Sequence, residues 1–316
     1  MKIVILGSEG FIATNLCFLL REKYEAELEL IGIDSGTNGS NNKQFTSSFC
    51  KHFAIDLNDS DALSDVIKDS DLIIHLAAKG NVIESIENPL INFESNVKAT
   101  ISLLEAMRKS NCSKIIFSST CGALMGNTPP PVSEESIPRP ISPYGSSKLA
   151  CEGYLSSYAE TFDIKSIILR FGNVYGPYSL HKKGVINKWI KQLINSEDII
   201  IFGKGTSSRD FINVGDICSG IDKSIKRIFS KGDIDKFEIF HLANNEEINL
   251  KNLYEILSSI IPSNSKLIFK PERKGEVIQN FSKYNKAMRI LDFSPKIGLE
   301  KGLKDLYKWI DKYDTN

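Results

Sequence analysis

Short apolar runs alternate with amphipathic helical stretches through the first half of the chain. The runs typical of buried strands are residues 2–6, 28–33, 71–77, 114–118 and 166–171. The stretches with apolar positions every three or four residues are 11–23, 92–110 and 146–161. Strands that alternate with helices predict βαβ units and a parallel sheet, whose ligand site lies where the carboxyl ends of the strands meet.

The pattern becomes less regular after residue 172. Helices are predicted at 185–196, 250–261 and 299–313, with one more strand at 237–242. The Pro-rich segment 127–143 excludes regular helix and central strand, so it predicts a surface loop. The sequence thus predicts an α/β fold: a Rossmann-type doubly wound parallel sheet with a smaller, interleaved C-terminal substrate-binding domain. The expected division is 1–172 plus about 209–245 for the first domain, and 173–208 with 246–316 for the second.

The turn after the first strand carries a cofactor signal, Gly7-Ser-Glu-Gly10-Phe-Ile-Ala13. Gly7 permits a tight turn, and Gly10 has no side chain to block a pyrophosphate at the positive N-terminus of the next helix. The second strand ends at Asp34, whose carboxylate can accept ribose hydroxyls and would repel a 2′-phosphate. No Arg or Lys follows it immediately. The sequence therefore predicts NAD, rather than NADP, as the cofactor.

The motif Pro-Tyr144-Gly-Ser-Ser-Lys148 carries the catalytic signal. Positions i and i+4 share a helix face, so Lys148 lies one turn from Tyr144. A nearby ammonium and a positive nicotinamide ring would favour the phenolate, which can take a proton from a substrate hydroxyl as hydride leaves. Alone, this spacing is common on solvated helix faces. The glycine turn upstream favours the catalytic interpretation.

A third polar group is expected at the end of the strand near residue 118. Ser118-Ser-Thr-Cys-Gly122 offers several hydroxyls for a substrate oxygen. Thr120 is the preferred candidate, Ser119 is second, and Cys121 is a weaker donor.

Composition and charge narrow the class of partner. Lys+Arg and Asp+Glu both number 39 in 316 residues, so no basic excess is present to hold nucleic acid. No apolar run approaches the length of a membrane span, and the N-terminal apolar run leads into a glycine turn rather than a cleavage site. The six cysteines lack zinc spacing and predict reduced thiols and no metal site. We therefore expect a cytoplasmic protein that binds neither nucleic acid nor membrane.

Together these motifs resemble the extended short-chain dehydrogenase/reductase family, and within it the NAD-dependent nucleotide-sugar epimerases and dehydratases. The resemblance covers nearly the whole chain and includes His75-Leu-Ala-Ala78 and Asn96. It makes Tyr144 and Lys148 the catalytic pair and implies a homodimer formed by the helices near 92–110 and 146–161. The cofactor-binding residues that it implies are Gly7, Gly10, Phe11, Ile12, Asp34, Ser35, Asp56, Leu57, Leu76, Ala77, Ala78, Lys79, Asn96, Ser118, Tyr144, Lys148 and Phe171.

The resemblance also implies a site for a nucleotide-diphosphate sugar. Leu169-Arg-Phe-Gly-Asn-Val-Tyr-Gly-Pro177 is close to a family signature in which Asn173 would meet the diphosphate. Arg209 and Arg273 would bind the same diphosphate, since a planar guanidinium suits bidentate phosphate contacts. The substrate-binding residues that it implies are Thr120, Asn173, Val185, Phe202 beside the base, Arg209, Arg273 and Glu276 near the ribose.

Two departures from the family pattern bear on the reaction. Leu124-Met-Gly126 stands where the family often has Val-Tyr-Gly, and Cys121-Gly122 stands where the 4,6-dehydratases carry Asp-Glu. Dehydration is therefore disfavoured. The sequence predicts an NAD-dependent epimerase of a UDP-linked sugar that works through a 4-keto intermediate. A 4-keto-sugar reductase, a decarboxylating synthase and a non-catalytic NAD-binding protein remain alternatives.

Overall fold

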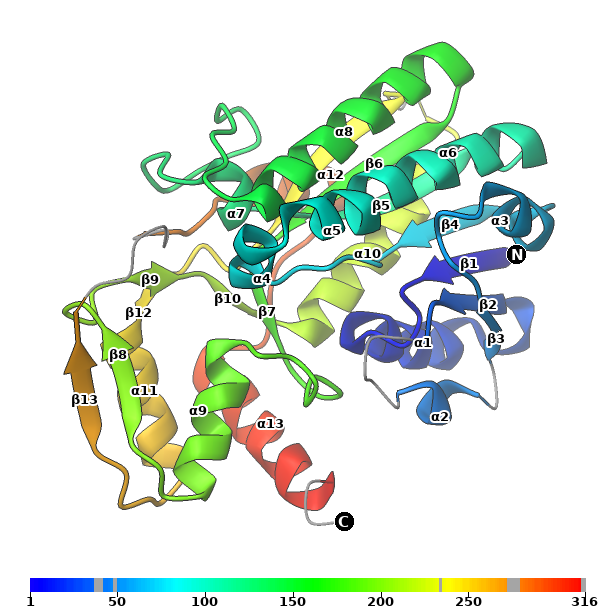
Figure 1. Ribbon diagram of the computed structural model, residues 1–316. Helices are drawn as coiled ribbons and strands as arrows, with labels where there is room; N and C mark the ends of the chain where they lie inside the picture. The colour runs from blue at the N-terminus through cyan, green and yellow to red at the C-terminus, as the bar shows by residue number, and fades with distance from the viewer. Residues whose placement is uncertain (37–41, 48–49, 233–234, 272–278, 314–316) are drawn as a thin grey trace.

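The computed structural model describes residues 1–36, 42–47, 50–232, 235–271 and 279–313 (Figure 1). Its centre is a seven-stranded sheet in the order β11-β6-β5-β4-β1-β2-β3, and every neighbouring pair is parallel. This arrangement confirms the predicted doubly wound sheet. The strands are β1 (Lys2–Leu6), β2 (Glu29–Asp34), β3 (Cys50–Ala54), β4 (Leu72–His75), β5 (Lys114–Thr120), β6 (Lys165–Phe171) and β11 (Phe237–Leu242).

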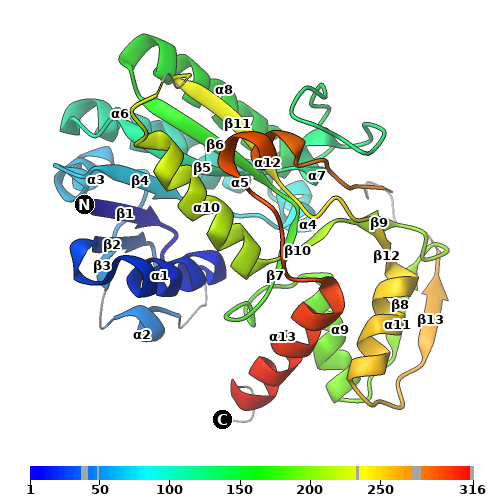
Figure 2. The same cartoon turned by 180° about the vertical axis from the view of Figure 1, so that it is seen from behind.

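Helices cover both faces of the sheet, as a comparison of Figures 1 and 2 shows. One face carries α3 (Ser60–Ile67), α4 (Val82–Glu87), α5 (Pro89–Phe93), the π-helical η2 (Glu94–Lys98), α6 (Ala99–Ser110) and α8 (Pro143–Phe162). The other carries α1 (Phe11–Tyr24), α10 (Val214–Ile228) and α12 (Asn285–Leu291). Successive residues of β1 enter different cores: Ile3 and Ile5 pack toward α1 and α10, whereas Val4 and Leu6 pack toward α3 and α6. Both faces of β1 are therefore buried, as its continuous apolar run requires.

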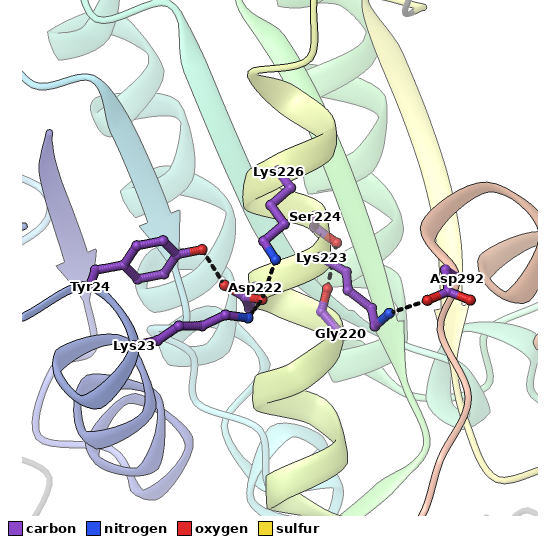
Figure 3. Close-up of polar contacts among 8 residues, drawn as sticks. All are labelled: Lys23, Tyr24, Gly220, Asp222, Lys223, Ser224, Lys226 and Asp292. Carbon is purple, nitrogen blue, oxygen red and sulfur yellow. Dashed lines mark hydrogen bonds and ion pairs between the residues drawn. The ribbon is translucent and has the colours of Figure 1, made fainter.

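The helices α1 and α10 are joined by a buried carboxylate, Asp222 (Figure 3). It accepts hydrogen bonds from the ammonium of Lys23 and from the hydroxyl of Tyr24, the latter at 2.6 Å. Burial and the Asp222 carboxylate raise the pKa of Tyr24, so the phenol stays a donor. Lys223 pairs with Asp292 just after α12 at 2.8 Å, which ties the third helix of this face to α10.

The C-terminal region has a separate core. It is built by α9 (Val185–Ile194), α11 (Leu250–Ile260) and α13 (Leu299–Tyr313), whose apolar faces meet around Trp189 and Leu303. Three short strand pairs complete it: β7 (Asn173–Tyr175) with β10 (Phe211–Asn213), β8 (Ile199–Phe202) with β13 (Leu267–Lys270), and β9 (Ser208–Arg209) with β12 (Ile248–Asn249). The separate core agrees with the expected second domain, whose boundaries stay a prediction.

The structure differs from the sequence expectations in several places. The helix predicted at 92–110 contains the π-helical η2, and the helix predicted from 146 begins at Pro143, which places Tyr144 in its first turn. The segment 127–143 is not purely a surface loop, because Val132 is buried and bridges to Ser282. Elements that the pattern did not predict are β3, the short strand pairs, η1 (Glu25–Glu27), α2 (Lys43–Thr46), α3, α4, α5, α7 (Gly122–Met125), α10 and α12.

All six cysteines are buried and none forms a disulfide. Among the residues that the structure describes, none of the helices combines the length and apolar character that a membrane crossing requires.

Candidate active site

The glycine-rich turn joins β1 to α1 at the carboxyl edge of the sheet. Gly7 has a φ of +78°, and a Cβ there would lie 2.6 Å from the backbone nitrogen of Ala77. Its own N–H donates to the carbonyl of Ile33 at 2.8 Å, so the turn packs tightly between β2 and the loop after β4. Gly10 is the N-cap of α1, and no side chain caps the helix. The first-turn N–H groups of α1 are therefore available to a phosphate, which is what a dinucleotide requires.

The carboxylate of Asp34 lies at the end of β2 beside this turn. It is largely buried, and it accepts hydrogen bonds from the N–H of Glu9 at 3.1 Å and of Gly36 at 3.4 Å. Burial and the Asp34 carboxylate raise the pKa of Glu9. These contacts fix the Asp34 carboxylate where a ribose attached to that phosphate would reach it. Ser35 follows it and is exposed.

The loop after β4 is held by asparagine side chains. The amide of Asn96 accepts from the N–H of Lys79 at 2.9 Å and donates to the Lys79 carbonyl at 3.2 Å. It also donates to the hydroxyl of Ser147 on α8 at 3.0 Å, and Asn92 donates to the Lys79 carbonyl at 2.9 Å. Asn96 lies in the π-helical η2, a distortion that is common at functional sites. It therefore couples the predicted cofactor loop, residues 76–79, to the predicted catalytic helix.

The helix α8 presents both members of the predicted catalytic pair. Ser142 caps it by accepting from the N–H of Gly145 at 3.2 Å, and Pro143 occupies its first turn. Tyr144 follows, and its ring lies over Gly80: a Cβ at Gly80 would stand 3.7 Å from the Tyr144 hydroxyl oxygen. One turn later, Lys148 is 2% exposed and donates to the Ser118 carbonyl at 2.8 Å.

Burial dominates the electrostatics of this pair. It raises the pKa of Tyr144 to about 12 and lowers the pKa of Lys148 to about 8. The expectation named two positive charges, the Lys148 ammonium and the nicotinamide ring. The Lys148 ammonium donates to a carbonyl, and desolvation of the phenol outweighs its charge. A further positive charge beside the phenol is needed to favour the phenolate.

The three candidates for the third polar group have different environments. Ser119 is buried and donates to Glu152 at 2.5 Å, and Cys121 is buried against the Arg170 carbonyl at 3.1 Å. Burial also raises the pKa of the Cys121 thiol. Thr120 ends β5, remains partly exposed, and its hydroxyl makes no hydrogen bond to any residue that the structure describes. Of the three, Thr120 has the side chain that can reach a ligand.

A buried ion pair behind the site was not assigned from the sequence. Arg170 on β6 contacts Glu152 on α8 through two bonds of 2.6 and 3.0 Å, and both side chains are 4% exposed. Ser119 joins the same carboxylate. The pair fixes α8 against β5 and β6, and thereby orients Tyr144. Arg170 stands inside the Leu-Arg-Phe-Gly-Asn motif, but its partner is 18 residues away, a separation that no local pattern marks.

The predicted sugar-binding residues lie on short elements. Asn173 is exposed on β7, and its N–H donates to the carbonyl of Asp210 at 2.7 Å, which brings β7 beside Arg209. Arg209 is partly exposed and donates to the Ser208 carbonyl at 2.7 Å. Val185 opens α9 and Phe202 ends β8. Arg273 and Glu276 lie outside the described residues.

Asp210 is a second residue that the sequence did not mark. Its buried carboxylate accepts from the N–H groups of Asn244, Asn245 and Ser282 at 2.9 to 3.1 Å. Burial raises its pKa to about 6. It holds three chain segments together next to Arg209.

The remaining predicted cofactor residues fall into two groups. Phe11, Ile12 and Phe171 pack in the core beneath the turn, and Leu57 packs partly against the other core. Asp56 is exposed and accepts from the N–H of Asn58 at 2.9 Å, which lowers its pKa. Its contact with an adenine stays a prediction.

The geometry defines a class of protein: a nicotinamide-dinucleotide enzyme with a Tyr-Lys pair beside the loop after β4. Comparison with known proteins gives the family. The model of the NAD dependent epimerase/dehydratase family matches residues 3–239, and this chain belongs to that family.

Named relatives agree along the full length. The UDP-glucuronate 4-epimerase of Thermodesulfobacterium geofontis is 27% identical over 97% of this chain and 95% of its own. The structure of UDP-glucose 4-epimerase from Thermotoga maritima with UDP-glucose superposes with a TM-score of 0.91, at 29% identity over 99% of each chain. UDP-glucuronic acid 4-epimerase from Bacillus cereus, with UDP-glucuronic acid and NAD, gives 0.90 at 29% identity, also over 99% of each. The chain is thus an NAD-dependent enzyme of the epimerase type.

Proposed function

We propose that this enzyme is a UDP-sugar 4-epimerase that oxidises the C4 hydroxyl and returns the hydride to the other face. One observation carries the assignment: Thr120, Tyr144 and Lys148 surround the carboxyl end of β5, next to the loop that Asn96 holds. The full-length relatives named as 4-epimerases support it.

The residues present fit NAD. A Cβ at Gly7 would collide with the loop after β4, and the uncapped α1 N-terminus suits a diphosphate. Gly7, Gly10, Asp34 and the backbone of residues 76–79 would hold the cofactor. Bound in its oxidised form, NAD supplies the hydride acceptor and a positive nicotinamide ring beside Tyr144.

The chain's own groups perform the proton chemistry. Thr120 donates to the C4 oxygen and orients the hydroxyl toward Tyr144. The Tyr144 phenolate accepts that proton as the C4–H bond breaks, and the phenol gives it back when the ketone is reduced. Lys148 keeps its ammonium one turn away and stabilises the phenolate, since the lowered pKa of about 8 still leaves it mostly charged at neutral pH.

The absence of a dehydratase acid supports epimerisation over water loss. In this chain, Cys121 and Gly122 follow Thr120, and Cys121 is buried with a raised pKa. A Cβ at Gly122 would lie 1.7 Å from the side-chain amide nitrogen of Asn280, so a larger residue here would require the Asn280 side chain to move. No general acid for removing a C6 hydroxyl arises from these two positions.

The test uses purified enzyme without added cofactor. Nucleotide released on denaturation is identified, and the native enzyme is incubated with UDP-glucose, UDP-glucuronic acid and UDP-N-acetylglucosamine. Co-purified NAD and formation of one C4 epimer are expected. Conversion that needs added NADH and a 4-keto sugar would make the enzyme a reductase, and release of CO₂ from the uronic sugar would make it a decarboxylase.

The proposal includes a homodimer, supported by an exposed apolar surface on α5 and α8. Leu90 is 76% exposed, Phe93 52% and Tyr154 43%, on neighbouring helices. A two-fold contact between copies would bury these side chains. A mass of two chains is expected by light scattering, and Leu90→Glu should shift it toward one. A cytoplasmic location fits six unpaired thiols.

A further inference from the structure

The loop between β7 and α9, residues 176–184, connects the C-terminal region with the ends of the sheet strands; we call it the crossing loop. In Figures 1 and 2 it extends from the C-terminal region to the side of α1. Its turns are closed internally: Ser179 donates to the Gly176 carbonyl at 2.6 Å, and the N–H of Lys182 donates to the Ser179 carbonyl at 2.8 Å. The loop is therefore an ordered structure with a defined path.

One side of the crossing loop is anchored to the elements after β1 and β2. Asn15 of α1 donates to the Pro177 carbonyl at 3.0 Å, and Asn42 donates to the Tyr178 carbonyl at 2.9 Å. The Tyr178 ring stacks on Phe18 of α1 at 5.6 Å between centroids and meets Phe45 of α2 edge-on at 4.9 Å.

The other side is anchored to the element after β4. Lys183 forms an ion pair of 2.9 Å with Glu84 on α4. Because β1 lies between β4 and β2 in the sheet, a loop fixed to α4 and to α2 passes over the end of β1. The glycine-rich turn lies there.

Lys182 lies between the two anchors of the crossing loop, after Tyr178 and directly before Lys183. Its ammonium is within electrostatic range of the carboxylates of Asp34, after β2, and Glu84, after β4. Desolvation by the surrounding protein lowers the pKa of Lys182, and the residue remains exposed to water. The uncapped N-terminus of α1 follows the glycine-rich turn, over which the crossing loop passes.

We propose that Lys182 binds the diphosphate of NAD from the side opposite to the glycine-rich turn, and that the crossing loop thereby retains the cofactor between catalytic cycles. Two sets of donors then enclose one dianionic group: the backbone N–H groups of α1 below and the ammonium above. The inference depends on NAD binding and not on which sugar the enzyme converts.

The experiment measures release of NAD in the absence of any sugar. Purified Lys182→Met, Lys182→Arg and wild-type enzymes with bound NAD are mixed with an excess of alcohol dehydrogenase and ethanol, and released NAD is followed as NADH absorbance. Lys188→Met, an exposed lysine on α9, is the matched control. Release from Lys182→Met should be about tenfold faster or more, the size of a charge-assisted contact. Lys182→Arg and Lys188→Met should release at the wild-type rate.

Ionic strength supplies the second measurement. The difference between wild type and Lys182→Met should shrink as KCl rises, because an open ion pair is screened. A wild-type release rate in Lys182→Met would overturn the proposal, whether or not KM for the UDP-sugar rises. A raised KM alone would assign the lysine to the substrate's diphosphate. Since no sugar is present in the release assay, failure of the epimerase assignment would not alter its outcome.

Discussion

The two sides of the site are built in different ways. The cofactor side consists of the glycine-rich turn, Asp34, the loop after β4, and the helix α8. The first three lie at the carboxyl ends of strands of the central sheet, and α8 packs on one face of that sheet. The sugar side consists of Asn173, Val185, Phe202 and Arg209, which lie on two- to four-residue strands or at a helix start. The first side is fixed by the sheet, whereas the second depends on loops and on buried groups such as Asp210.

The two sides of the site differ in how many contacts hold their residues in place. On the cofactor side, Asn96 and the Arg170–Glu152 pair connect strands to helices through several bonds each. On the sugar side, Asp210 alone gathers three backbone N–H groups. Substitutions on the cofactor side should therefore change kcat, the free energy of unfolding or the amount of bound NAD. Substitutions on the sugar side should mainly change KM for the UDP-sugar.

The largest effect is expected for Tyr144→Phe. Loss of the proton acceptor should lower kcat about 10²- to 10⁴-fold, the usual contribution of a positioned acid–base group. The ring remains and so does the contact with Gly80, so NAD content and thermal unfolding should match wild type. Steady-state kinetics check this, with Tyr313→Phe, exposed at the end of α13, as the control. Activity equal to wild type on every UDP-sugar would remove Tyr144 from the mechanism.

Gly7→Ala tests the fixed geometry of the cofactor side. The φ of +78° and the 2.6 Å approach to the Ala77 nitrogen leave no room for a methyl group. The free energy of unfolding should fall by about 2 to 4 kcal/mol, and the protein should purify with little NAD. Urea unfolding and nucleotide analysis measure both. Gly153→Ala is the control, because a Cβ there meets nothing within 4 Å. Full NAD content in Gly7→Ala would contradict the tight turn.

The contrast between the two sides of the site also explains which features the sequence could predict. Six of the seven sheet strands, the glycine-rich turn and the Tyr144–Lys148 spacing follow from local patterns, because buried parallel strands are continuous apolar runs. The helices α3, α10 and α12 were not predicted. The edge strand β3 was not predicted because only the first of its five residues, Cys50, is buried, so it shows no continuous apolar run. The Arg170–Glu152 pair and the Asp210 contacts join distant segments, so only the folded chain reveals them.

The choice among Ser119, Thr120 and Cys121 also required the structure. All three have polar side chains at one strand end. The sequence analysis preferred Thr120 and set Cys121 lower as a weaker donor, but no local pattern separated Thr120 from Ser119. The sheet sends Ser119 toward Glu152 and leaves Thr120 partly exposed. Exposure, which alternation along a strand decides, is what separates them.

Arg209→Met tests the sugar side. Loss of a guanidinium that binds the diphosphate should raise KM for the UDP-sugar about 10- to 100-fold, with kcat changed much less. NAD content should stay at the wild-type level, since Arg209 lies on β9, away from the sheet. Arg289→Met, an exposed arginine on α12, serves as the control. A fall in kcat without a change in KM would place Arg209 in the chemistry and would break the division between the two sides.

The last prediction concerns an acid sensitivity of the sheet. Burial lowers the pKa of His75 on β4 and of His241 on β11 to about 3 each. The unfolded value is about 6.5, so the unfolded chain binds more protons between pH 6.5 and 3. Their contribution to stability is therefore complete above pH 6.5 and is lost as the pH falls toward 3.

From pH 7 to pH 5 each histidine should remove about 2 kcal/mol from the free energy of unfolding. Urea titrations followed by tryptophan emission measure this, and Trp189 and Trp309 both report from the C-terminal core. His241→Gln should lose its share of the pH dependence, whatever its stability at pH 7. If the tryptophans detect the acid effect, the C-terminal core unfolds together with the sheet. The urea midpoint from tryptophan emission could instead stay independent of pH while the midpoint from the circular-dichroism signal of the helices falls with pH. That result would show that the C-terminal core and the sheet unfold separately.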